Sequence, residues 1–180
     1  MYAIHDTETS CPGNHIPAMA VVSYAKIDDL RRSLPAPKAA LMHRVEVTHY
    51  FPFPAETVFA AWLDQDTVGE WLFATPEGEM IEVALTPKVG GSYRIVERRA
   101  DGDILHTGTY ERIDAPHDLE FSFSVPHYDP GSVHVRIHIA NVADGCNLTL
   151  THEVEEQWLK PSTHGWQTIL SNLETTLRHP

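Results

Sequence analysis

The last stretch of the chain, residues 161–179, most constrains the fold, because its apolar residues recur with the period of an α-helix. Spacings of i, i+3, i+4, i+7 and i+11 place one set on a single helix face: Trp166, Ile169, Leu170, Leu173 and Leu177. Pro161 is expected in the first turn, where its missing N–H costs nothing. Burying this face contributes on the order of 10 kcal/mol, so we predict a long C-terminal helix that packs on the core.

Composition limits the remaining possibilities. A chain of 180 residues with 42% hydrophobic content fits one domain with a sizeable core. Lys and Arg number 13 against 25 Asp and Glu, so the formal charge of −12 disfavours nucleic acid and anionic membranes as partners. Two cysteines, Cys11 and Cys146, cannot form a disulfide framework, and a reducing cytoplasm is therefore the predicted location.

The first part of the chain lacks a core-forming pattern. Residues 1–42 contain several prolines and no sustained apolar periodicity. We predict a flexible N-terminal extension over residues 1–42 and a single folded domain over residues 43–180.

The remainder predicts an α+β fold. Alternation over residues 44–51 predicts the first strand, Pro54 opens a short helix, and Thr67 with Glu70 forms a capping-box pattern for a second one. Six further strand-like runs, separated by turn signals such as Gly90-Gly91, follow at 80–85, 92–98, 104–113, 119–125, 133–140 and 147–154. Short connections favour an antiparallel sheet of about seven strands, with one face covered by the last helix.

Several motifs carry a resemblance to a known family. They are FPAETVFAAW at 53–62, Trp71, PKVGGSY at 87–93, GTY at 108–110, LTLTH at 148–152 and Gly165-Trp166. Together they resemble the Hsp90-ATPase-activator-like (AHSA1-like) family of the START and Bet v 1-like superfamily. The resemblance implies a helix-grip fold, in which a curved sheet wraps a long C-terminal helix and leaves an apolar cavity between them. No segment matches the separate amino-terminal domain through which eukaryotic co-chaperones of this family act on Hsp90.

His152 is the most informative polar residue. It shares the parity of Leu148, Leu150 and Val154, so its side chain should point inward, either as a hydrogen-bonded core histidine or as a group that orients a ligand. Inward aromatic residues would supply apolar walls, although all of them are also core candidates. The predicted ligand-binding residues are Trp71, Tyr93, Tyr110, Phe121, Phe123, His152, Trp166 and Leu170.

Patterns for metal binding or nucleophilic catalysis are weak. The chain has 12 histidines but no HExxH motif, and His134, Arg136 and His138 alternate with aliphatic residues as on a solvated sheet face. No GxSxG motif occurs either. We therefore predict no metal, no cofactor and no catalytic residue.

These observations favour non-catalytic binding of a small hydrophobic or aromatic molecule between sheet and helix. An alternative is a cofactor-free enzyme of the polyketide cyclase or dehydratase type, with His152 or Tyr110 as acid or base. Another is an interaction module that binds an Hsp90-type chaperone, and a homodimer is left open. Fold alone does not choose among them.

Overall fold

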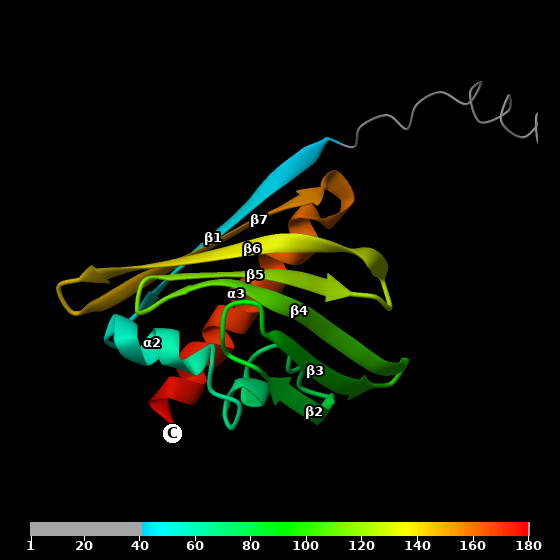
Figure 1. Ribbon diagram of the computed structural model, residues 1–180, viewed down its shortest axis with the longest axis horizontal. Helices are drawn as coiled ribbons and strands as arrows, with labels where there is room; N and C mark the ends of the chain where they lie inside the picture. Colours follow the sequence, from blue (N-terminus) through cyan, green and yellow to red (C-terminus); the bar gives the residue numbers. More distant parts are fainter. Residues whose placement is uncertain (1–40, 180) are drawn as a thin grey trace, which may run out of the picture. The chain divides into compact units, whose positions relative to one another are not determined.

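The computed structural model describes residues 41–179, which form a curved antiparallel sheet packed against a long helix (Figure 1). Along the sheet the strands follow the order β1-β7-β6-β5-β4-β3-β2. Their bounds are β1 Met42–Phe51, β2 Glu79–Leu85, β3 Ser92–Arg99, β4 Gly102–Asp114, β5 Asp118–Val125, β6 Asp129–Val142 and β7 Gly145–Glu155. The helices are α2 Ala55–Ala61, the 3₁₀ turn η1 Val68–Glu70 and α3 Glu156–Arg178. The predicted α+β helix-grip fold is confirmed.

The C-terminal helix begins earlier than the sequence predicts. α3 starts at Glu156, and Pro161 lies inside it instead of in its first turn. β7 runs to Glu155, which takes an extended conformation and serves directly as the N-cap. Pro161 cannot donate to the carbonyl four residues before it, that of Gln157. Because Gln157 is exposed, water can satisfy this carbonyl, and the proline is tolerated.

The capping box predicted at Thr67 and Glu70 is wrong. Neither side chain caps η1. The Thr67 hydroxyl instead donates to Asp64 Oδ2 at 2.8 Å, while Asp64 Oδ1 accepts the N–H of Asp66 at 3.0 Å. An Asx turn centred on Asp64 therefore replaces the side-chain cap.

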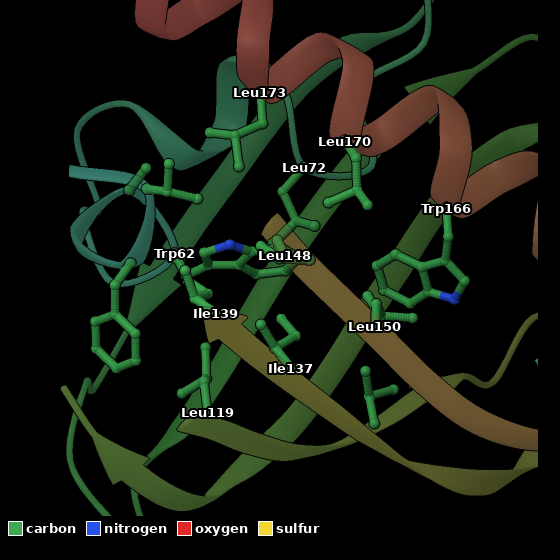
Figure 2. Packing of buried hydrophobic residues seen from close by; sticks show 14 of the residues in the cluster. Trp62, Leu72, Leu119, Ile137, Ile139, Leu148, Leu150, Trp166, Leu170 and Leu173 are labelled. Atoms are coloured by element: carbon green, nitrogen blue, oxygen red, sulfur yellow. The ribbon is translucent and has the colours of Figure 1, made fainter. Parts of the chain in front are cut away.

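The apolar face of α3 packs on the concave face of the sheet, in the predicted register. Trp166, Leu170 and Leu173 are buried, and Ile169 and Leu177 pack at the margins. Figure 2 shows the three buried side chains pointing from α3 toward a layer of aliphatic residues from β6 and β7, labelled Ile137, Ile139, Leu148 and Leu150. This layer is the centre of the hydrophobic core.

Strands β6 and β7 pair along only part of their length. Their ladder runs from Val142 opposite Gly145 to Arg136 opposite Thr151. Beyond that point β6 remains paired only with β5, and β7 remains paired only with β1. We call this opening, between residues 129–135 and residues 152–155, the β6–β7 split. In Figure 1, β1 and β7 diverge from β6 toward the start of α3.

The described residues bear on the N-terminal extension and on membrane-spanning helices only in part. The predicted flexible extension, residues 1–42, lies almost wholly outside them, and β1 begins at its last residue, Met42. Within residues 41–179, no helix has both the length and the apolar character needed to cross a membrane.

Candidate ligand-binding site

His152 points from β7 to the inner side of the sheet, as predicted, and is 5% exposed. The indole Nε1 of Trp166 donates a hydrogen bond to His152 Nε2 at 2.9 Å. Because an indole N–H can only donate, Nε2 must be the acceptor, and the proton of the neutral ring lies on Nδ1. Nδ1 is buried and makes no hydrogen bond of good geometry with the described residues. Its one neighbour of this kind is the backbone of Glu153, in poor alignment, so the Nδ1–H donor of His152 is only partly satisfied.

Burial also fixes the charge of His152. It lowers the pKa of the imidazole to about 4, although the backbone of Glu153 offsets part of this effect. A charged imidazole would lose hydration that the surrounding side chains do not replace. At neutral pH, His152 is uncharged.

A column of aromatic rings links His152 to a second buried histidine. Trp166 meets Phe123 edge to face at 5.7 Å, and Phe123 stacks on Phe73 at 5.2 Å between centroids. Phe73 stacks in turn on His106 at 4.2 Å, with an interplanar angle of 6°. His106 is 5% exposed and its Nδ1 is unpaired. Burial, together with the charge of Arg99, lowers the pKa of His106 to about 4.

A buried carboxylate holds the loop that carries Phe73. Glu97 is 1% exposed and accepts hydrogen bonds from the Thr75 N–H at 2.6 Å, from the Thr75 hydroxyl and from Arg99 Nε. Burial alone would raise the pKa of Glu97, but the bonds from Thr75 and Arg99 outweigh it and lower the pKa. Phe73 has a φ of 64°, which is strained for a bulky residue. The ionised Glu97 thus helps to hold a strained backbone conformation that places Phe73 over His106.

Gly78 provides a test of this arrangement. A Cβ at position 78 would overlap Glu97 Oε1, whereas one at Gly165, on α3, would meet open space. We expect Gly78→Ala to lower the free energy of unfolding by about 1–3 kcal/mol, as for overpacking. Gly165→Ala should raise it by about 0.5–1 kcal/mol. Urea unfolding measures both, and unchanged stability in Gly78→Ala would show that Glu97 does not hold the loop closely.

The inner side of the split opens into a cleft of about 290 Å³, which we call the inner cleft. It lies between the β5–β6 connection and the first turns of α3, and is lined mainly by Phe123, Tyr128, Val133, His152, Trp158 and Ser162, with Asp129 and Glu155 also at its border. A separate void under the sheet, bordered by Tyr93, Tyr110 and Phe121, measures only about 10 Å³. The void holds no more than one water. Another cleft, of about 350 Å³, lies beside Trp71 and Leu177 near the end of α3. The inner cleft differs from it in being lined by His152.

Residues 52–178 match the family model described as Activator of Hsp90 ATPase homolog 1-like protein. The chain belongs to this AHSA1-like family. No curated protein matches it.

Solved structures share the AHSA1-like fold. An AHSA1-like protein from Aeromonas hydrophila is 24% identical, with a TM-score of 0.65 over 76% of this chain and 92% of that one. A putative uncharacterized protein from Rhizobium leguminosarum is 17% identical, with a TM-score of 0.67 over 79% and 98%. A protein of unknown function from Staphylococcus aureus is 18% identical, with a TM-score of 0.66 over 78% and 99%. At these identities the likeness shows the fold alone.

The AHSA1-like structure separates the predicted site residues into groups. Phe123 and His152 line the inner cleft, and Trp166 contacts both. Three others border the small void: Tyr93, Tyr110 and Phe121. Trp71 packs edge to face on Trp62 at 4.8 Å and borders the cleft of about 350 Å³ near the end of α3. Leu170 is fully buried in the core. Sequence reasoning missed Phe73, Glu97 and His106; His106 shares the parity of Ile104 and Tyr110 and could have been found in the same way as His152.

The outer face of the sheet carries the polar trio predicted there. His134 lies between Glu111 and Glu120, and His138 bonds Asp118 at 2.9 Å. Arg136 extends into solvent with its side chain 66% exposed. Among residues 41–179, no group of three or more histidines, cysteines or acidic residues has an arrangement that could hold a metal ion.

Proposed function

We propose that this AHSA1-like chain binds a small hydrophobic or aromatic molecule in the inner cleft, without catalysis. The observation that carries the proposal is His152, a buried neutral imidazole that lines a mainly apolar cleft of about 290 Å³ and whose Nδ1–H has no hydrogen bond of good geometry. Concave, mainly apolar spaces of this size with one or a few polar groups are typical of small-molecule sites.

In this proposal the apolar walls of the inner cleft and its polar residue His152 have separate roles. Phe123, Tyr128 and Trp158 offer apolar surface to the body of a ligand. The Nδ1–H of His152 offers one hydrogen bond to an oxygen of the ligand. A buried donor without a partner costs about 1–3 kcal/mol, so a ligand with an acceptor at this point recovers energy that the free protein lacks.

The charge states of the two candidate acid–base groups favour binding over catalysis. His152 has a low pKa and its Nε2 is occupied by Trp166, which makes it a weak base. Burial raises the pKa of Tyr110 to about 12, so its hydroxyl keeps its proton at neutral pH. Tyr110 borders the small void and His152 the inner cleft, so the two groups do not share one site.

A cyclase-like reaction remains the second candidate function. A chaperone partner and a cytoplasmic location remain predictions from the sequence.

A titration with a neutral apolar dye, N-phenyl-1-naphthylamine, tests the proposal. We expect about one site on the full chain, with displacement by aromatic or acyl compounds. Trp158→Ala should weaken dye binding about 5–10-fold, because Trp158 lines the cleft and is 40% exposed before binding. Tyr50→Ala is the matched control, since Tyr50 is 47% exposed on β1 and lies outside the cleft. No binding, or equal binding by Trp158→Ala, would refute the proposal.

A further inference from the structure

The β6–β7 split lies between two clefts, one on each face of the sheet. If the ladder continued in register, Val135 would face His152 and Val133 would face Val154. Those pairs are not formed in the structure, and a second cleft of about 460 Å³ lies on the outer face at the same place. We call it the outer cleft.

The two clefts share lining residues at the split. Side chains alternate between the faces of a strand, and on β6 and β7 the inward residues include Val133 and His152, while Ser132, Arg136 and Glu153 point outward. The outer cleft nevertheless reaches Val133 and His152, and the inner cleft reaches the outward residue Ser132. Met42, Ser132, Val133 and His152 line both clefts. The two clefts therefore meet at the split, and His152 lines both of them.

Two arginines line the outer cleft, each with an acidic neighbour. Arg44 and Arg136 line the outer cleft together with one carboxylate, that of Glu153. Arg44 pairs with Glu46 at 2.9 Å, and Arg136 Nε donates to His134 at 3.0 Å, with Glu120 at 3.6 Å. Their side chains are 65% and 66% exposed. Each guanidinium has five N–H donors, so both keep donors for a further anion.

We propose that the ligand of this site is a carboxylic acid with an apolar, aromatic-sized body, bound across the split. Its body lies in the inner cleft against Phe123 and Trp158. Its carboxylate lies in the split, where it accepts the Nδ1–H of His152 and meets Arg44 and Arg136 from the outer cleft. The inference rests on the proposed function and names the ligand class of the same site.

Calorimetric titration of the full chain at pH 7.5 with 1-naphthaleneacetate and with 2-(1-naphthyl)ethanol tests the carboxylate. The two probes share one ring system and differ in charge. We expect the acid to bind about 10-fold more tightly than the alcohol, as for a charge-assisted hydrogen bond. The double variant Arg44→Gln/Arg136→Gln should lose this preference. The control Arg94→Gln/Arg98→Gln removes the same charge from β3, outside both clefts, and should keep it.

A second pair of variants tests whether the ligand lies across the split. Ser132→Trp fills the split and should weaken binding of the acid at least 10-fold, whereas Ala140→Trp, on the same face in the paired half of β6, should not. Tight binding of the acid to Ser132→Trp would overturn the inference. Equal binding of acid and alcohol, or a preference lost in both double variants, would also overturn it while leaving the proposed function intact. Failure of both probes to bind the unmodified chain would refute both proposals.

Discussion

Trp166→Ala is expected to lower the free energy of unfolding by about 3–5 kcal/mol, the range for removing a large aromatic side chain from a core. Trp166 is 3% exposed and contacts Phe73 and Phe123 edge to face. Its loss also removes the donor to His152 Nε2, so both nitrogens of a buried ring become unpaired. Most small domains are stable by only about 5–15 kcal/mol, so much of the variant could unfold at moderate urea concentrations.

Two further variants separate the contributions to this loss. Trp166→Phe keeps a ring in the core but removes the N–H, and should cost about 1–3 kcal/mol. Trp158→Ala removes a tryptophan from the same helix where it is 40% exposed, and should cost less than about 1 kcal/mol. Urea unfolding followed by circular dichroism gives all three values. If Trp166→Ala cost less than about 1 kcal/mol, the packing of α3 described above would be incorrect.

Acidification from pH 6.5 to pH 4.5 is expected to remove about 2–3 kcal/mol of stability for each of His106 and His152. Burial lowers the pKa of both imidazoles from the ordinary 6.5 to about 4. As the pH falls through 6.5, the unfolded chain takes up protons that the folded chain does not accept until about pH 4. Stability is therefore present above pH 6.5 and is lost in this window, which urea unfolding at closely spaced pH values would measure.

Between pH 6.5 and 4.5, the change in stability reports on the two histidines and not on the carboxylates of low pKa. Glu97 and Glu174 have a pKa below the ordinary 4.5 in the folded chain, so their contributions are lost only at lower pH. His152→Phe and His106→Gln should each remove about half of the slope between pH 6.5 and 4.5, and the double variant should remove most of it. Stability that stays constant over this window in the unmodified chain would show that the two rings are not buried in neutral form.

Local patterns in the sequence were sufficient to predict the layers of the fold. Alternation placed His152 on the inner face, and the stripe from Trp166 to Leu177 gave the register of α3, because both depend on the period of one element. The start of α3 was missed because Pro161 is a common first-turn residue, while the true start has no side-chain cap.

The candidate site could be predicted only in part, since it depends on pairing between strands. No pattern within residues 129–135 or 152–155 indicates that these two segments separate. How much space remains among inward aromatics also depends on their packing, which left about 10 Å³ beside Tyr110 and about 290 Å³ beside Phe123. The sequence therefore predicted that His152 and Phe123 face inward but not the β6–β7 split beside them.

The pairing of β1 with β7 has a consequence for how the chain folds as it is made. Met42 lies opposite Glu155, and Phe51 opposite Cys146, so the first strand of the domain pairs with the last. Translation adds about 5–20 residues per second, so β1 must wait roughly 5–20 s before its partner is synthesised. Contacts so distant in sequence also slow the search for the native topology. During that interval β1 is an unpaired edge, and its alternate polar residues, such as Arg44 and Glu46, are the kind of charged positions that keep such edges from joining other chains.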